Sequence, residues 1–304
     1  MKYITETLDF KLDGSNIITL GKFDGLHKGH QRLIERVIEL GEKQEETVVF
    51  TFDVPPIEII KGARHQTLLT NKERKKMIEA AGIDCLIECP FAPEIMNMEP
   101  EVFVEEILVK QLNISCAVIG ADFHFGHNRQ GNSLILEALG ERYGFSVEVL
   151  DKVSDGEREI SSTYIREEII KGNIAKSNEL LGYPYFITGE VIRGQQLGST
   201  IGMPTINQIP EITKQLPPFG VYTSTTLIGG RYYQSVSNIG VKPTVGSEVA
   251  GIETYLFDCD EDLYGLEAKV SLLHFQRSEQ KFISLTALQA QLVQDKEIAS
   301  KFSN

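Results

Sequence analysis

The sequence predicts an α/β protein of two domains, in which a parallel sheet with helices on its faces precedes an antiparallel β-barrel or sandwich. At 304 residues the chain is long enough to bury a core in each half. Strand-like runs alternate with helical patterns up to about residue 180, which is typical of a parallel sheet. After Gly182-Tyr183-Pro184, Thr, Tyr, Val and Gly are frequent and strand patterns dominate. We therefore expect one domain over residues 1–182 and a second over 183–304.

The elements of the first domain follow from its apolar periodicity. Short apolar runs predict strands at 16–20, 47–52, 84–88, 116–119 and 146–150. Three- and four-residue spacing predicts helices at 30–43, 71–81, 101–111 and 133–143. In such sheets ligands bind beyond the carboxyl ends of the strands. We expect the loops after residues 20, 52 and 119 to meet there.

The second domain is predicted to be mostly β. Alternating, β-branched or aromatic residues predict strands at 185–192, 221–227, 231–239, 252–257 and 268–275. Gly229-Gly230 is a hairpin signal between two of them. Consecutive strands with short turns indicate an antiparallel barrel or sandwich. Helical spacing over 284–302 predicts a terminal helix that docks on it.

Composition and charge argue against several classes of protein. The net charge is -13 and no basic stripe is present, which argues against general nucleic-acid binding. The one basic cluster, residues 72–76, is expected on a solvated helix face. No stretch approaches about eighteen consecutive apolar residues, so a channel, pump or exporter is not expected.

The N-terminus and the cysteines favour a cytoplasmic protein. The first residues carry acids early and lack the apolar core of a signal peptide. The four cysteines show neither metal-ligand spacing nor a dense disulfide pattern. We expect reduced thiols, as in a cytoplasm.

The segment 21–30, GKFDGLHKGH, leads from a strand through glycines into a helix N-terminus. Such a terminus favours anions, and His27 and His30 can contact a phosphate whose charge grows during reaction. We interpret this segment as a site for a reaction at a nucleotide phosphate. The alternative is that the histidines cap the helix or are exposed to solvent. No nearby Cys or third His completes a metal-ligand set. The other residues assigned to cofactor binding in this turn are Gly21, Phe23, Asp24 and Gly25.

The loop 120–131 combines aromatic and charged residues between glycines. Phe123 and Phe125 can cover a planar ring while Asp122 or Arg129 fixes its polar edge. The alternative is that the aromatic residues anchor the loop to the core.

The segment 158–166 indicates an anion site. Three hydroxyls precede a helical run, and one would suffice as an N-cap. Together with the flanking arginines they suit a phosphate, and a capped helix with surface arginines is the alternative. The residues assigned to this site are Arg158, Ser161, Ser162, Thr163 and Arg166.

The second domain carries a glycine-punctuated loop over 194–207 that includes Gly194 and Gly198. Thr205 and Asn207 are two apart, so on a strand they face the same way and offer neutral oxygens to Mg²⁺. Ordinary turn chemistry is the alternative. Glu253 lies in an apolar strand, and we favour a position on its solvent-exposed face over a role in acid–base catalysis.

Taken in order, these motifs resemble those of the bacterial bifunctional riboflavin kinase/FMN adenylyltransferases, also called FAD synthetases. The resemblance covers nearly the whole chain. It implies a Rossmann-like nucleotidyltransferase domain followed by a riboflavin kinase-like antiparallel β-barrel with a terminal helix. The segments that carry it are GKFDGLHKGH, TFDVPP, GADFHFGHNRQG, REISSTYIR, GSTIGMPTIN, FGVYTSTT, SNIGVKPTVG, IETYLFD, DLYG and RSEQKF.

In the first domain, the resemblance implies that FMN and ATP are joined to give FAD and pyrophosphate. His27 and His30 would stabilise charge at the attacked α-phosphate, and the loop with Asp122 would line the flavin or adenine pocket. The leaving pyrophosphate would be held by Ser161, Ser162, Thr163 and Arg166.

In the second domain, the resemblance implies phosphorylation of riboflavin to FMN by ATP. Thr205 and Asn207 would bind Mg²⁺, Glu253 would accept the proton of the ribityl hydroxyl, and Arg277 would contact the flavin. The implied partners are riboflavin, FMN, FAD and ATP, with no nucleic acid and no membrane.

Three positions depart from the family pattern. Pro55 stands where the family often has histidine, Ser199 where it often has arginine, and Met203 replaces phenylalanine. These departures leave room for a monofunctional FMN adenylyltransferase with a degenerate kinase domain. A flavin-sensing protein with low turnover, and a nucleotidyltransferase for another phosphorylated acceptor, are further alternatives. The oligomeric state is left open.

Overall fold

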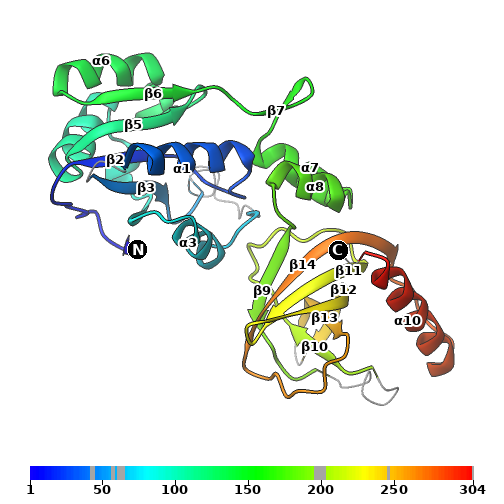
Figure 1. The fold of residues 1–304 in the computed structure, drawn as a ribbon. Coiled ribbons are helices and arrows are strands. Elements are labelled where there is room, and N and C mark those ends of the chain that lie inside the picture. Colours follow the sequence, from blue (N-terminus) through cyan, green and yellow to red (C-terminus); the bar gives the residue numbers. More distant parts are fainter. Residues whose placement is uncertain (42–44, 56–58, 60–65, 195–202, 245–246, 303–304) are drawn as a thin grey trace. The chain divides into compact units, whose positions relative to one another are not determined.

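The computed structural model describes residues 1–41, 45–55, 59, 66–194, 203–244 and 247–302. Contacts divide the chain into two compact units, Met1–Ser162 and Thr163–Asn304 (Figure 1). The helices α7 (Ser162–Ile170) and α8 (Ile174–Leu181) therefore fall almost wholly in the second unit. The domain boundary after residue 182 stays a prediction.

The first unit is built on a six-stranded sheet in the order β1-β4-β3-β2-β5-β6, in which every neighbouring pair is parallel. Every residue of β2 and β4 is buried, as expected of strands covered on both faces. The predicted strands are confirmed, and β1 was not predicted because four residues carry too little periodicity. The strands are β1 (Lys2–Thr5), β2 (Asn16–Leu20), β3 (Glu46–Phe52), β4 (Cys85–Cys89), β5 (Ile114–Gly120) and β6 (Ser146–Leu150).

Helices cover this sheet. α1 (Lys28–Gly41) contacts β2, β3 and β5 (Figure 1). Apolar residues of α6 (Ser133–Tyr143) and η1 (Val104–Gln111) pack against alternate residues of the strands in one apolar cluster. The helix predicted at 101–111 is α5 (Pro100–Phe103) followed by π-helical η1. The remaining elements are α3 (Asn71–Ala80), α4 (Pro93–Met96), η2 (His127–Arg129), β7 (Ser154–Asp155) and β8 (Arg158–Glu159).

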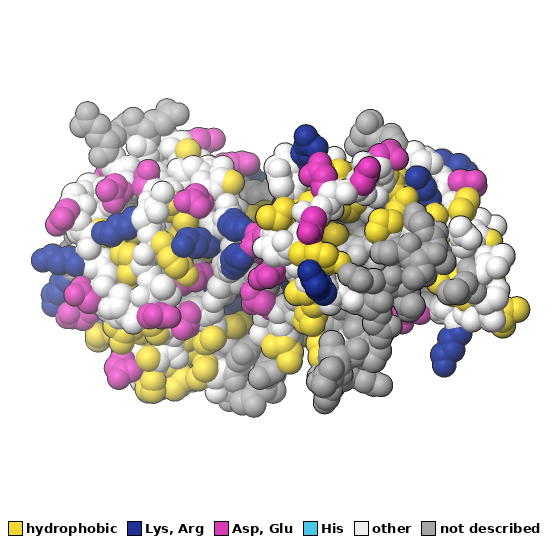
Figure 2. All heavy atoms as spheres, turned by 90° about the horizontal axis from the view of Figure 1, so that it is seen from below, with side chains coloured by type: hydrophobic (Ala, Val, Ile, Leu, Met, Phe, Trp, Pro, Cys, Tyr) yellow, Lys and Arg dark blue, Asp and Glu magenta, His cyan; other side chains and the backbone are white. Residues whose placement is uncertain are grey.

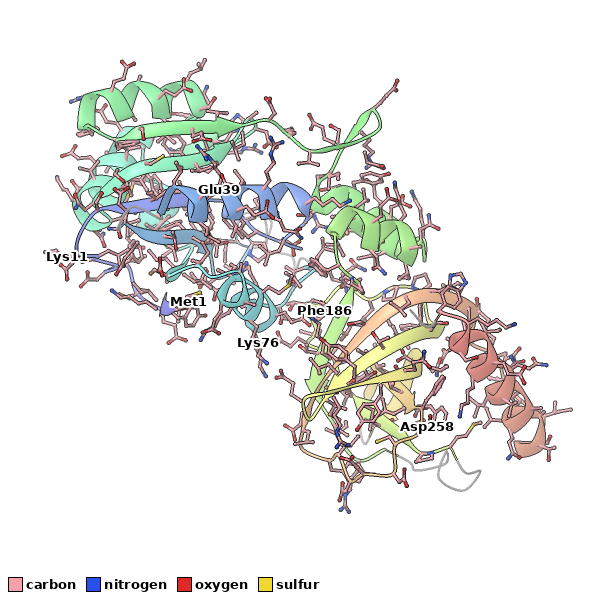
Figure 3. The ribbon with its side chains drawn as sticks, in the orientation of Figure 1. Met1, Lys11, Glu39, Lys76, Phe186 and Asp258 are labelled. Atoms are coloured by element: carbon pink, nitrogen blue, oxygen red, sulfur yellow. The ribbon has the colours of Figure 1, made fainter. Side chains whose placement is uncertain are left out.

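The prediction that residues 72–76 form a solvated face is wrong for Arg74. Thr70 and Glu73 form a capping box that begins α3 and sets its phase. Arg74 then lies on the same side of the helix as Ile78, and both are buried. Lys76 is exposed, and Figure 3 shows its side chain pointing outward. Only part of the basic run is therefore solvated.

The second unit contains one antiparallel six-stranded sheet in the order β10-β13-β12-β11-β14-β9. The sheet curls so that the Ile192 N–H donates to the Asn207 carbonyl at 2.8 Å, which brings its two edges together. A single curled sheet confirms the barrel rather than the sandwich. The strands are β9 (Phe186–Glu190), β10 (Thr205–Gln208), β11 (Gly220–Ile228), β12 (Arg231–Thr244), β13 (Ser247–Leu256) and β14 (Glu267–Ser278).

One face of this sheet is buried and the other is partly covered by a helix. The buried face combines apolar residues such as Tyr222 and Ile252 with a chain of hydroxyls that includes Ser224, Ser237 and Thr254. The terminal helix α10 (Leu285–Ser300) contacts β11 and β12, as predicted.

Charged side chains of both signs are interspersed on the face of the molecule drawn in Figure 2. Within the described ranges, no helix is long and apolar enough to cross a membrane.

Candidate active sites

The turn after β2 is held in an unusual backbone conformation. Phe23 and Leu26 have φ values of 46° and 38°, and Gly25 has a φ of 85°. Such angles are costly for side-chain-bearing residues and persist only where the surroundings fix them. The Asp24 carboxylate accepts from the backbone N–H of Leu68 at 2.7 Å. The turn is therefore pinned from outside its own sequence.

Other polar contacts complete this fixation. Ser162 Oγ donates to the Asp24 carbonyl at 2.7 Å, and Gln31 Nε2 donates to the Leu26 carbonyl at 2.7 Å. Asp24 and Ser162 were expected to bind ligand, and here they shape the turn. Their ligand-binding roles stay predictions.

The two histidines at the start of α1 form a stacked pair. Their ring centroids are 3.7 Å apart, and the His30 ring lies 5.2 Å from the Phe23 ring. The ideal Cβ position of Gly29 lies 3.2 Å from the His27 ring, so a side chain there would crowd the pair. Neither Nδ1 atom has a hydrogen-bond partner in the described part of the chain. Two buried, unpartnered nitrogens at a helix N-terminus suit a ligand with acceptor oxygens.

Burial sets the charge of this pair. It lowers the pKa of His27 to about 4, although the carboxylate of Asp122 opposes the shift. Burial also lowers the pKa of His30 well below its usual value, and His27 adds to that effect. Both rings are therefore neutral near pH 7, and each offers an N–H donor. An anion bound against them would favour their protonated forms.

The loop 120–131 has one anchoring and one partly exposed aromatic ring. Phe125 is buried and its ring lies 5.9 Å from Phe103, so it anchors the loop. Phe123 is half-buried and stacks on Phe125 at 5.6 Å. Arg129 is exposed, has a φ of 60° and contacts His124. The covering of a planar ring by Phe123 stays a prediction.

Lys152 is a charged residue at the carboxyl edge of the parallel sheet, and it was assigned no role from the sequence. Its Nζ lies 3.2 Å from Asp122 Oδ2 and 2.5 Å from Glu159 Oε2. Its position just after β6, at the carboxyl edge of the sheet, was the available signal.

The predicted phosphate-binding hydroxyls lie around the start of α7. Arg158 is an exposed residue of β8, and Ser161 is half-buried. Thr163 is exposed and Arg166 half-buried in the first part of α7. Their use with the histidines stays a prediction.

In the second unit, strand register aligns three polar residues. Asn207 of β10 pairs with Glu253 of β13, which pairs in turn with Asn238 of β12. Directly paired residues point to the same face of a sheet, so these side chains form a row. Thr205 faces the same way because it is two residues from Asn207. The three paired residues are half-buried.

Asn238 belongs to this row but was assigned no role from the sequence. Its Nδ2 donates to Glu279 Oε1 at 3.2 Å. Its buried Oδ1 has no partner within the described ranges. The signal that could have found it is the register with Glu253, which only strand pairing reveals.

The residues around Asn207 fit a cation such as Mg²⁺. Thr205 and Asn207 supply neutral oxygens, the ligands that leave room for water and phosphate. The ideal Cβ position of Gly194 lies 2.4 Å from Asn207 Nδ2, so a side chain at position 194 would displace this amide. In the described residues, no three His, Cys, Asp or Glu side chains are grouped to hold a metal ion.

Arg277 is the remaining predicted contact in this unit. Its Nη2 lies 2.6 Å from Asp295 Oδ2 and its Nε lies 3.0 Å from Asp295 Oδ1, a bidentate pair between β14 and α10. Its contact with flavin stays a prediction. Gly198 and Ser199 lie outside the described residues.

Comparisons with known proteins agree with both halves of this description. A family model described as FAD synthetase matches residues 10–164, and one described as riboflavin kinase matches 181–303. The chain is 35% identical to the bifunctional riboflavin kinase/FMN adenylyltransferase of Escherichia coli (strain K12), over 94% of this chain and 92% of that protein. The protein of the same description from Listeria monocytogenes is 32% identical over 97% of this chain and 95% of its own.

A solved structure is also similar over the whole chain. The crystal structure described as a macrolide-efflux protein from Streptococcus pneumoniae has a TM-score of 0.87 at 30% identity and covers 97% of each chain. The two domain matches and the full-length relatives agree with the order of motifs in the sequence. This chain belongs to the family of bifunctional riboflavin kinase/FMN adenylyltransferases.

Proposed function

We propose that this chain phosphorylates riboflavin to FMN with ATP and then adenylylates FMN to FAD with release of pyrophosphate. Matches to both enzyme families in one chain are the observation that carries this proposal. The two polar clusters, one in each unit, are the proposed sites.

In the adenylyltransferase, a phosphate oxygen of FMN attacks the α-phosphorus of ATP, and the bond to the β-phosphate breaks. His27 and His30 donate hydrogen bonds to oxygens whose charge increases in the transition state. Because buried imidazoles lie in a low dielectric, such donors stabilise that charge more than water does. Ser161, Ser162, Thr163 and Arg166 would hold the leaving pyrophosphate.

In the kinase, the ribityl 5′-oxygen of riboflavin attacks the γ-phosphorus of ATP and ADP leaves. Glu253 accepts the proton of that hydroxyl. Thr205 and Asn207 would hold Mg²⁺, which neutralises phosphate charge when bound. Asn238 Oδ1, anchored by its amide contact with Glu279, is an acceptor beside this base.

A cytoplasmic location and small-molecule partners complete the proposal. All four cysteines are free, which supports a reducing compartment.

The test is chromatographic analysis of products after the protein is mixed with riboflavin, ATP and MgCl₂. FMN followed by FAD is expected. Glu253→Gln should stop at riboflavin yet still convert added FMN to FAD, and His27→Ala should accumulate FMN. FAD from FMN but no FMN from riboflavin would instead indicate a degenerate kinase domain. No flavin product from either substrate would refute the enzymatic proposal and favour a flavin sensor.

A further inference from the structure

Arg74 and Glu88 form a buried ion pair that the proposed reactions do not use. The side chains are 9% and 1% exposed, and Arg74 Nε lies 3.1 Å from Glu88 Oε1. The other carboxylate oxygen of Glu88 accepts from the Tyr3 hydroxyl at 2.5 Å. Well-packed apolar residues can often replace a buried pair without loss of stability. Stability alone therefore does not account for this pair.

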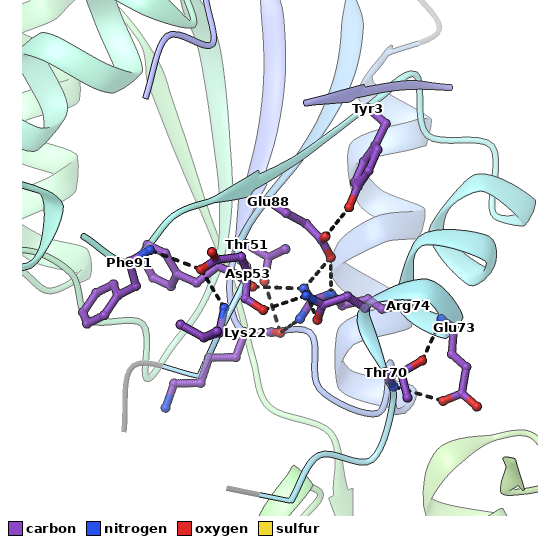
Figure 4. A network of polar contacts seen from close by, with 12 residues as sticks. Tyr3, Lys22, Thr51, Asp53, Thr70, Glu73, Arg74, Glu88 and Phe91 are labelled. Carbon is purple, nitrogen blue, oxygen red and sulfur yellow. Dashed lines mark hydrogen bonds and ion pairs between the residues drawn. The ribbon is translucent and has the colours of Figure 1, made fainter. Parts of the chain in front are cut away.

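The remaining donors of Arg74 reach Asn71 Oδ1 of the same helix, at 3.1 Å, and the ends of two other strands. Nη2 donates to the Phe52 carbonyl at 2.9 Å, where β3 ends, and Nη1 lies 3.4 Å from the Lys22 carbonyl, just after β2 (Figure 4). Glu88 itself lies in β4. A single guanidinium thus joins the carboxyl ends of three adjacent strands.

The Lys22 carbonyl is a fixed point of the turn that leads to the histidines. Thr51 Oγ1 also donates to it at 3.2 Å. The next residue, Phe23, is fully buried with a φ of 46°, and its ring contacts His30. A shift of this carbonyl would move Phe23 and, through it, the stacked imidazoles.

We propose that Arg74 is a positioning residue for the adenylyltransferase reaction. Its guanidinium fixes the Lys22 and Phe52 carbonyls and so holds His27 and His30 in their reactive places. It acts through the turn and touches neither substrate. This inference rests on the proposed role of the histidine pair.

The chemistry of arginine accounts for the choice of residue. A planar fork with five N–H donors can satisfy one carboxylate and two carbonyls at the same time. A lysine would keep the charge pair with Glu88 but, as a single point donor, could not span all three partners. Substitution by lysine therefore separates the ion pair from the carbonyl contacts.

Four proteins test the inference: wild type, Arg74→Lys, the double variant Arg74→Met/Glu88→Leu, and Lys75→Met. Lys75 is a matched control because it lies on the same helix and contacts only the Tyr3 ring, at 3.8 Å, among the interactions described. Each is assayed for kcat and KM of FAD formation from FMN. Riboflavin kinase activity of the same sample and thermal unfolding by circular dichroism report on the intact chain.

For Arg74→Lys and for the double variant, we expect kcat of FAD formation to fall about 10- to 100-fold. We expect little change in KM or in kinase activity, and a lower unfolding temperature for Arg74→Lys, in which buried acceptors lose a donor. Lys75→Met should match wild type. A folded double variant or Arg74→Lys protein with wild-type kcat would overturn the inference, as would equal losses in both activities. If wild type itself makes no FAD from FMN, the proposed function fails instead.

Discussion

Gly194→Ala tests the proposed place of Asn207 in the kinase site. The added Cβ would lie 2.4 Å from Nδ2, 2.5 Å from Cγ and 2.7 Å from Oδ1 of Asn207, whereas real Cβ atoms essentially never approach below 3.0 Å. These three atoms are the flexible end of the Asn207 side chain, so the amide can rotate away from the added Cβ. The amide must leave its position, and the Asn207 oxygen would no longer be offered beside Thr205.

Loss of one contact to a charged group costs about 1.5–3 kcal/mol. That corresponds to a fall of roughly 10- to 100-fold in kcat/KM for riboflavin phosphorylation. The assay measures FMN formation at increasing MgCl₂, with FAD formation from added FMN as the internal standard. We expect the kinase to lose activity and to need more Mg²⁺, while FAD formation is unchanged.

Gly189→Ala is the matched control for this substitution. It lies on the neighbouring strand β9, where the nearest atom to the added Cβ is Gln208 Nε2 at 3.3 Å. A small shift of that side chain can absorb the contact. If Gly194→Ala and Gly189→Ala both leave kinase activity and its Mg²⁺ requirement as in wild type, Asn207 does not take part in the site.

Three further predictions concern single side chains. Glu253→Gln should lower kinase turnover by about 10²- to 10⁴-fold and leave FAD formation from FMN intact, and an unchanged kinase would exclude Glu253 as the base. Asn238→Ala should lower kinase kcat/KM by about tenfold, because one acceptor is lost, and a change confined to the unfolding temperature would argue against a ligand contact. Since the pKa of His27 is about 4 rather than 6.5, the unfolded state binds its proton more readily, and stability should fall as pH decreases from 6.5 to 4. Wild type should therefore lose on the order of 3 kcal/mol more than His27→Asn over this range, measured by denaturant unfolding, and parallel curves would contradict the buried neutral state.

The order of elements could be predicted because it depends on local periodicity. Strands at 16–20 and 146–150 and the helix at 133–143 have the predicted bounds, since apolar runs and turn residues mark both ends. The strand pattern of the second domain did not distinguish a barrel from a sandwich, because strand composition is the same in both. The bridge from Ile192 to Asn207, across a glycine-rich loop, decided for the barrel.

Residues whose neighbours are distant in the chain could not be identified from the sequence. Asn238 joins Glu253 only through the β12–β13 register, and Lys152 meets Asp122 only at the edge of the sheet. Arg74 was taken for a solvated residue because its neighbours in the chain are charged. The phase of α3 turns it toward Glu88, and no local pattern of charge reveals that direction.

The sequence by itself determined the two-domain α/β organisation, the order of motifs and, through them, the family. These properties depend on side-chain period and on the residue types that phosphate chemistry requires, and both can be read along the chain. The tertiary structure alone decided that His27 is buried and stacks on the half-buried His30, that both rings are neutral, and that Asn207, Glu253 and Asn238 form one row. Burial and cross-strand register arise from packing between distant segments, and that packing fixes both the charge of a side chain and the neighbours it can work with.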